Sequence, residues 1–267
     1  MHMMNSMIIG KYVPGDSLIH RLDPRTKLLF MFIYVFIVFL ANNGWTYGLL
    51  TFFTCVLLLL SRIPFSFMVK GLKPVLWIIV FTFLLHVLLT KEGEIVFQWL
   101  GIEVYDKAIQ QGTFISLRFL LLIVVTTLVT LTTTPIEVTD GMESLLSPLK
   151  KWNIPVHELA LMMSISLRFI PTLMEETEKI MKAQTARGVD FSSGPLSERM
   201  KAMTALLVPL FISSFKRAEE LAIAMEVRGY RGGRNRTKWR ELTWRRIDTA
   251  FMFLLGLLAI LLWLLRS

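Results

Sequence analysis

Two arginine-glycine pairs have the residue types and spacing best suited to specific recognition chemistry. Arg187-Gly188 and Arg228-Gly229 each complete the pattern Glu-x4-Ala-x3-Arg-Gly, and the second pair follows the first by 41 residues. A glycine just past a helix can adopt the left-handed conformation that closes it. An arginine in the last turn lies at the negative end of the helix dipole. Each arginine therefore either caps its own helix or offers its planar guanidinium to a carboxylate of another protein.

An apolar stripe leads into each pair. Its members recur at steps of four and three residues, the spacing of one helix face. Before the second pair they are Phe211, Phe215, Ala218, Ala222 and Met225. The equivalent positions of the first copy are Ile170, Met174, Thr177, Met181 and Gln184, so the stripe is kept until its last, more polar member. The sequence thus predicts one helical device used twice.

The composition places these helices in a membrane protein. The chain has 267 residues, of which 54% are hydrophobic, with a mean hydropathy of +0.57 and a net charge of +9. Its apolar residues cluster in long runs, which excludes an ordinary soluble domain. Cys55 is the one cysteine, so no disulfide or cysteine-rich metal site can form within the chain.

Apolar runs define the predicted topology. The first, at 28–41, is slightly short for a span, so its helix is expected to extend over 26–43. The other spans are expected at 45–60, 74–90, 112–133 and 247–265. The loops on one side are basic, whereas 91–111 is acidic, so the positive-inside rule predicts a cytoplasmic N-terminus and an outer C-terminus. Asp23-Pro24 is a typical helix start. Arg118, inside the fourth span, is either a functional group or a side chain that snorkels to the outer surface, and we favour the second interpretation.

Residues 134–248 contain no stretch with the length and lack of charge of a span. We expect a helix after Asp140, capped by Asp140 with Glu143, a helix from Pro155 to Arg187 bent at Pro171, and a helix from 197 to 228. The predicted fold is therefore an all-α integral membrane protein with about five spans and a large cytoplasmic helical segment between the fourth and fifth. Its parts are a four-span region at 1–133, this segment at 134–248, and a final span at 249–267.

No motif for catalysis is present. The sequence lacks a Gly-x4-Gly-Lys-Ser/Thr phosphate loop, a His-Glu-x-x-His motif, a Cys-x-x-Cys motif and a Gly-x-Ser-x-Gly motif. We therefore predict no enzyme activity and no catalytic, cofactor or metal site. The segment at 134–248 is too apolar to remain bare in water, which indicates a protein partner or the membrane interface.

At this point the chain resembles a known family along essentially its whole length. The opening Leu22-Asp23-Pro24-Arg25-Thr26-Lys27-Leu28, the stretch Leu167-Arg168-Phe169-Ile170-Pro171 and the two Arg-Gly helix ends are similar to those of the transmembrane T component of energy-coupling-factor (ECF) transporters. These are importers of the ATP-binding-cassette class. Ala186-Arg187-Gly188 fits the family signature, whereas Val227 replaces the alanine before Arg228-Gly229.

The resemblance implies a non-catalytic coupling subunit in the bacterial cell membrane. Its partners would be two cytosolic ATPase subunits, a membrane-embedded substrate-binding S subunit and the lipid bilayer, with no nucleic acid. The ATPase-binding residues would be Ala186, Arg187, Gly188, Arg228 and Gly229. The length and the Asp-Pro-Arg motif are more similar to the shared module that serves vitamin-binding subunits than to dedicated cobalt or nickel importers.

Three alternative functions remain open from the sequence. A permease that binds its own substrate would need polar groups facing a cavity within its spans, and the spans offer few. A lipid-modifying membrane enzyme would need a converging nucleophile or acid–base pair. A pure scaffold has the same sequence features as a coupling subunit, and only transport assays separate the two.

Overall fold

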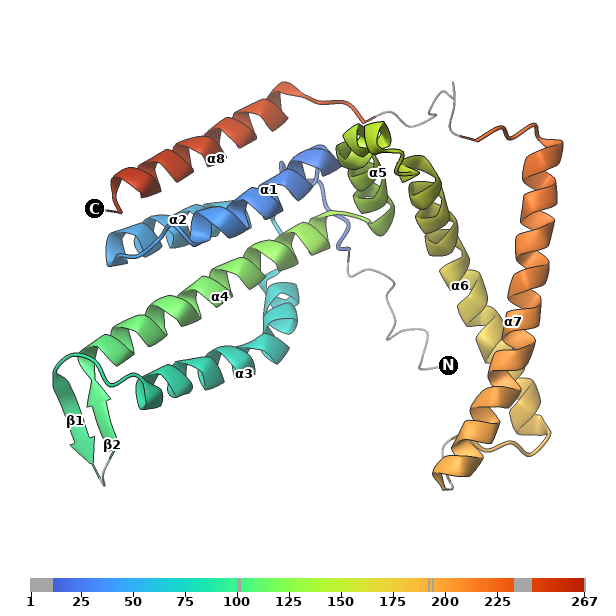
Figure 1. The fold of residues 1–267 in the computed structure, drawn as a ribbon, viewed down its shortest axis with the longest axis horizontal. Coiled ribbons are helices and arrows are strands. Elements are labelled where there is room, and N and C mark those ends of the chain that lie inside the picture. Colours follow the sequence, from blue (N-terminus) through green and yellow to red (C-terminus); the bar gives the residue numbers. More distant parts are fainter. Residues whose placement is uncertain (1–11, 100–101, 192, 194, 233–241, 267) are drawn as a thin grey trace. The chain divides into compact units, whose positions relative to one another are not determined.

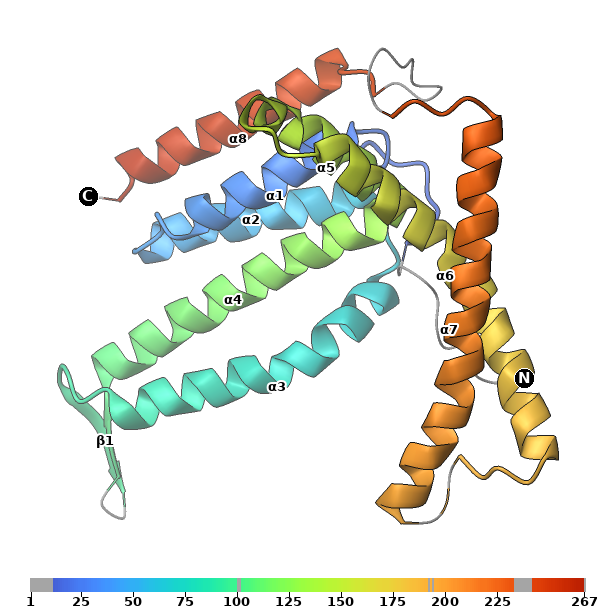
Figure 2. The same cartoon turned by 45° about the vertical axis from the view of Figure 1, so that its right-hand side comes forward.

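The computed structural model describes residues 12–99, 102–191, 193, 195–232 and 242–266. Most of these residues lie in helices (Figure 1). It divides into two compact units, one formed by residues 1–145 with 241–267 and the other by 146–240. Figure 2 shows the same helices after a rotation of 45°. The all-α prediction is therefore confirmed.

The first unit is a helical bundle with one hairpin. Its elements are α1 (Pro24–Val38), α2 (Gly44–Ser61), α3 (Phe65–Leu89), β1 (Ile95–Trp99), β2 (Ile102–Tyr105), α4 (Asp106–Thr132), α5 (Pro135–Leu146) and α8 (Arg246–Leu264). Helices α1, α2, α4 and α8 share a core that includes the buried side chains of Tyr34, Leu50, Leu128 and Leu255. The Tyr34 hydroxyl and Thr54 Oγ1, 2.7 Å apart, join α1 to α2 inside this core.

Helix α1 begins where the sequence predicts. Asp23 is its N-cap, and the Asp23 carboxylate accepts a hydrogen bond of 2.8 Å from the Arg25 backbone N–H. Pro24 occupies the first helical turn, where its missing N–H would have no partner in any case.

Among the described residues, five helices are by length and composition able to cross a membrane. They are α2, the part of α3 from Gly71 to Leu89, α4, α6 (Val156–Ala186) and α8. The chain is thus a multi-pass membrane protein, and the predicted number of spans is confirmed. The set differs from the prediction in two places. Helix α1 has 15 residues, about 22 Å of helix against a hydrocarbon core of about 30 Å. Helix α6 was predicted to lie outside the spans, but by its length and composition it is able to cross a membrane.

The helix predicted to start after Asp140 begins earlier. It is α5, and Asp140 lies in its interior. The capping box is made by Thr134 and Glu137 instead: Glu137 Oε2 accepts from the Thr134 N–H at 3.0 Å, and Thr134 Oγ1 accepts from the Glu137 N–H at 3.2 Å. Both pairs have the spacing of a capping box, and Pro135 at the first helical position favours the earlier start.

The predicted loop at 91–111 is partly regular. It contains the antiparallel hairpin β1–β2, in which Gln98 pairs with Glu103 and Ile95 with Tyr105. Helix α4 starts directly after it at Asp106 rather than at Gly112. The acidic residues of this segment favoured the prediction of a loop. The alternating apolar residues at its centre, however, are typical of a strand.

Arg118 lies against the end of α1. Its Nη2 donates to the Ala41 carbonyl at 3.3 Å, and its guanidinium carbon is 4.9 Å from the centre of the Phe39 ring. The carbonyls that follow α1 are acceptors of the kind that cations satisfy at helix C-termini. Arg118 therefore has a structural partner within the first unit.

The second unit consists of η1 (Ser147–Trp152), α6 and α7 (Leu196–Val227). Helix α6 includes Pro171 and α7 includes Pro209, and each helix continues through its proline. The predicted limits, 155–187 and 197–228, agree with α6 and α7 to within a residue or two. The two copies of the sequence pattern are therefore two long helices, each about 45–50 Å in length.

Candidate functional site

The end of α6 is closed by a complete Schellman motif, the pair of backbone hydrogen bonds that satisfies the last carbonyls of a helix. Arg187 is the C-cap, and Gly188 has a φ of 88°. The Gly188 N–H donates to the Thr185 carbonyl at 2.9 Å, and the Val189 N–H donates to the Gln184 carbonyl at 3.0 Å. The predicted left-handed glycine is confirmed at this end.

The end of α7 repeats the motif 41 residues later. Arg228 is the C-cap, and Gly229 has a φ of 74°. The Gly229 N–H donates to the Glu226 carbonyl at 2.8 Å, and the Tyr230 N–H donates to the Met225 carbonyl at 3.0 Å. The sequence repeat is thus also a repeat of backbone hydrogen bonds. We call residues 186–188 and 227–229 the two tips.

The tip side chains are available to a partner. Arg187 and Arg228 are both exposed, and neither guanidinium has a hydrogen bond or an ion pair with another residue in the described part of the chain. Val227, which replaces the alanine of the first tip, is 82% exposed. The predicted site residues are all exposed, so the tips can contact another molecule.

The two tips lie at opposite ends of one helix pair. Helices α6 and α7 run in opposite directions and cross, so the last turn of α6 is at the bottom of Figure 1 and the last turn of α7 is at the top. Figure 2 shows the same arrangement. The Gln184 side chain of α6 donates to the Ala205 carbonyl of α7 at 3.4 Å, near the first tip.

An ion pair joins the helices near their middle. Glu176 Oε2 accepts from Arg217 Nη2 at 2.6 Å and from Arg217 Nε at 3.1 Å, and Glu176 Oε1 accepts from Ser213 Oγ at 2.6 Å. Glu176 and Arg217 are 41 residues apart, so they occupy equivalent positions of the repeat. The sequence analysis did not identify this pair, although opposite charges at equivalent repeat positions are a signal that could have found it.

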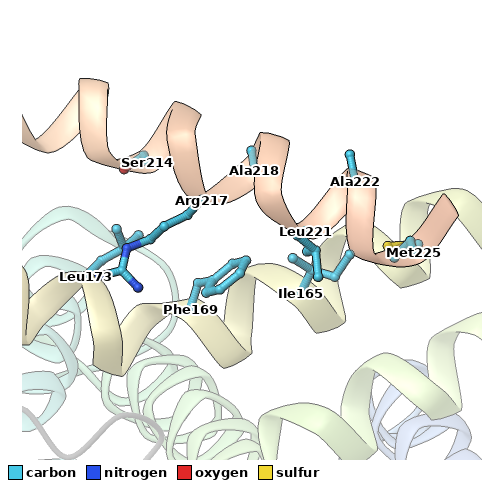
Figure 3. Close-up of a pocket in the computed structure, with 9 residues that line it drawn as sticks. All are labelled: Ile165, Phe169, Leu173, Ser214, Arg217, Ala218, Leu221, Ala222 and Met225. Atoms are coloured by element: carbon cyan, nitrogen blue, oxygen red, sulfur yellow. The ribbon is translucent and has the colours of Figure 1, made fainter. Parts of the chain in front are cut away.

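The surfaces around this ion pair are largely apolar. A pocket of about 330 Å³ opens between α6 and α7 (Figure 3), lined by Ile165, Phe169, Leu173, Ser214, Arg217, Ala218, Leu221, Ala222 and Met225. The predicted stripe divides here, because its last three members line the pocket while Phe211 and Phe215 are exposed, Phe215 to 72%. Other exposed apolar side chains on α7 include Met200, Met203, Leu207 and Ile212. Such a surface indicates a protein or lipid partner.

Two comparisons with known proteins found matches over most of the chain. A family model described as "Cobalt transport protein" matches residues 15–239. The "Energy-coupling factor transporter transmembrane protein EcfT" of Bacillus subtilis is 67% identical over 265 residues, which cover 99% of this chain and 100% of that protein. This chain belongs to the energy-coupling factor transmembrane protein family. Further family members of the same name, from Listeria innocua and Streptococcus equi, are 54% and 50% identical over 99% of this chain.

Membership of this family indicates the kind of assembly in which the helical repeat works. The energy-coupling factor relatives are named as the transmembrane proteins of a transporter, and the five candidate spans agree with that name. The chain is therefore the transmembrane component of an energy-coupling factor transporter. Within the described residues, no group of three His, Cys, Asp or Glu side chains could hold a metal ion.

Replacing a tip glycine should destabilise the tip through its backbone alone. A Cβ at Gly229 would meet no atom within 4 Å, but φ is +74°, so Gly229→Ala should cost about 1–2 kcal/mol. Gly229→Asn should cost less, because asparagine tolerates this conformation. The control is Gly48→Ala, an equally open site inside α2. Thermal unfolding of the purified chain measures the difference, and equal melting temperatures for Gly229→Ala and Gly48→Ala would contradict it.

Proposed function

We propose that this chain couples ATP hydrolysis by two cytosolic ATPase subunits to a small membrane-embedded S subunit that binds the transported substrate. The observation that carries the proposal is the repeated tip: two exposed arginines, each on a Schellman-capped helix end, lie at opposite ends of one antiparallel pair. Two equivalent tips match the two docking sites of an ATPase dimer. The chain itself is a non-catalytic subunit.

Arginine suits this docking role better than lysine. Its guanidinium presents five donors in a fixed plane and binds a carboxylate through two parallel hydrogen bonds. A helix end with a left-handed glycine projects that group beyond the last turn without further side chains around it. Each tip, Ala186-Arg187-Gly188 and Arg228-Gly229, would enter a groove on one ATPase subunit. Closure of the ATPase pair on ATP would then move the tips and the helices behind them.

The S subunit would rest on the apolar surface of α6 and α7. This surface includes the exposed Phe211 and Phe215 of α7 and the pocket beside Arg217. Charged residues fill the second half of α6, including Glu175, Glu178 and Lys182. That charge supports a cytoplasmic position for the segment at 134–248, between a membrane region at 1–133 and a final span at 249–267. The basic loops support a cytoplasmic N-terminus and an outer C-terminus.

The substrate class we propose is a vitamin or similar micronutrient. The proposal rests on relatives that are named for the energy-coupling factor rather than for one substrate. The alternative is a dedicated cobalt or nickel importer, and the description of the family model, "Cobalt transport protein", favours it. A permease that binds its own substrate is the remaining alternative.

Co-purification tests the proposal. We expect the tagged chain, co-expressed with its candidate ATPases and S subunits, to be recovered with two ATPase chains and one S subunit. The purified chain alone should neither hydrolyse ATP nor bind a vitamin or Co²⁺ tightly. Recovery of the chain without partners, together with tight binding of either ligand, would contradict the proposal and favour the permease.

A further inference from the structure

A buried network of charged and polar groups surrounds the start of α1. Three of its members, Asp23, Arg25 and Lys27, lie within residues 22–28, which have no part in the tips. Asp23 is 5% exposed, and its carboxylate accepts from Arg25 Nε at 3.1 Å and from Arg25 Nη2 at 3.0 Å. These bonds, with the capping bond to the Arg25 N–H, fix the plane of the Arg25 guanidinium.

Asp248 connects this network to α8. Its side chain is fully enclosed, at 1% exposed. Asp248 Oδ1 accepts from the Asp23 N–H at 2.9 Å, and Asp248 Oδ2 accepts from the Arg245 N–H at 2.8 Å. Lys27, also buried, donates to the Thr132 carbonyl at the end of α4 at 2.8 Å. One polar cluster therefore joins the start of α1, the start of α8 and the end of α4.

Arg25 extends the cluster to two further segments. Its Nη1 donates to Ser144 Oγ in α5 at 3.4 Å, and its Nη2 donates to the Leu242 carbonyl, before α8, at 2.9 Å. Helix α5 is also held tightly against α1 at Gly141, where a Cβ would lie 3.0 Å from Leu28 Cδ1 and 3.3 Å from the Pro24 carbonyl carbon. One guanidinium thus holds Ser144 and Leu242, which are 98 positions apart in the sequence.

Ser144 and Leu242 flank the unit that carries α6 and α7. The unit that carries α6 and α7 runs from 146 to 240, and Ser144 and Leu242 lie two residues outside each of its limits. Arg25 therefore binds the chain where it leaves the membrane bundle and again where it returns. We propose that Arg25, oriented by Asp23 and supported by Asp248, is a positioning residue that clamps both roots of the α6–α7 segment to the bundle.

A clamp at this place would matter for coupling. A helix pair that is pushed at its tips transmits displacement to the membrane bundle only if its two attachments stay fixed. Backbone carbonyl and hydroxyl acceptors held by one rigid guanidinium resist separation more than exposed ion pairs do, because the charge here is largely enclosed. The inference rests on the proposed coupling function and adds the residues that make the two roots act as one.

The test compares coupling in the reconstituted complex, with radiolabelled riboflavin and a riboflavin-binding S subunit as the probe. Arg25→Lys keeps the charge beside Asp23 but lacks the planar fork that reaches both acceptors. We expect normal assembly and ATP hydrolysis, and roughly tenfold less riboflavin transported per ATP. Losing a hydrogen bond to a charged group shifts the equilibrium from held toward released roots by about that factor. Arg21→Ala is the control, since Arg21 pairs with the exposed Asp16 and takes no part in the network among the residues that the structure describes.

A chemical clamp should replace the guanidinium. In a chain with Cys55→Ala, we introduce Ser144→Cys and Leu242→Cys together with Arg25→Lys, and join the thiols with a short bifunctional reagent. Cross-linking is expected to restore transport per ATP to within about twofold of the cross-linked Arg25 chain, because it fixes the two roots without the network. A role of Arg25 in folding alone would not be rescued in this way.

The outcomes separate this inference from the proposed function. Arg25→Lys with wild-type coupling overturns the clamp, and so does an uncoupled Arg25→Lys chain that cross-linking fails to restore. A parallel sample with Arg187→Ala and Arg228→Ala tests the tips. If that sample still transports, the proposed function fails. If the tips are essential but Arg25→Lys couples normally, the clamp alone fails.

Discussion

Replacing both tip arginines, Arg187→Ala with Arg228→Ala, is expected to abolish recovery of the ATPase subunits with the chain and to abolish transport. Each arginine would form charge-assisted hydrogen bonds that lose water on docking. Truncating one leaves its partner group unpaired and should cost about 2–5 kcal/mol of docking free energy. Because the two contacts hold one complex, the attachment is bivalent, and losing both removes it.

The size of the effect separates docking from helix capping. Loss of an exposed arginine that only complements the helix dipole would cost about 0.3–1 kcal/mol and would lower helix stability rather than assembly. A matched control removes the same charge from the same helices: Lys182→Ala with Lys216→Ala, two exposed lysines outside the tips. Quantitative recovery of ATPase subunits compares the two double variants. Equal recovery with both would mean that the tips are ordinary helix caps.

Reversing the ion pair between α6 and α7 is expected to have the second largest effect. Glu176→Arg places two guanidiniums together and should destabilise the helix pair by about 1–2 kcal/mol. This expected cost lies between the costs of disrupting exposed and buried ion pairs, since the side chains of Arg217 and Glu176 are 38% and 22% exposed. Adding Arg217→Glu should recover at least half of the loss, the result expected of a direct interaction in a double-mutant cycle.

The control for this reversal is an ion pair within one helix. Lys182 and Glu178 are 4.0 Å apart on α6, and Glu178→Lys should cost only about 0.2–0.5 kcal/mol. Thermal unfolding of the purified chain and transport by the complex are both measured. Glu176 does not join the two helices if Glu176→Arg lowers stability and transport no more than Glu178→Lys does. The same conclusion follows if adding Arg217→Glu lowers them further instead of restoring them.

The tips could be predicted from the sequence because their cause is local. A glycine after a periodic apolar stripe closes a helix whatever lies around it, so Gly188 and Gly229 have the expected positive φ. The same is true of Asp23-Pro24 at the start of α1. The repeat itself was visible in residue types alone, and its confirmation needed only the backbone of each helix.

The remaining features depend on information that local patterns do not contain. Asp140 with Glu143 and Thr134 with Glu137 have the same capping spacing, and a proline decided between them. The Arg25 network joins residues 98 and more positions apart, and no periodicity marks such contacts. Helix α1 ends at Val38, before the predicted end of its span at residue 43, since hydrophobicity indicates burial and does not set where a helix ends.

Site-specific cross-linking from the tips tests the central claim most directly. In a chain with Cys55→Ala, Ala186→Cys and Val227→Cys carry a photoactivatable thiol reagent in the assembled complex. We predict that each position alone cross-links one ATPase subunit and that a chain with both cysteines yields a product containing two. A complex that assembles and transports, while neither tip cross-links an ATPase subunit, would contradict the account.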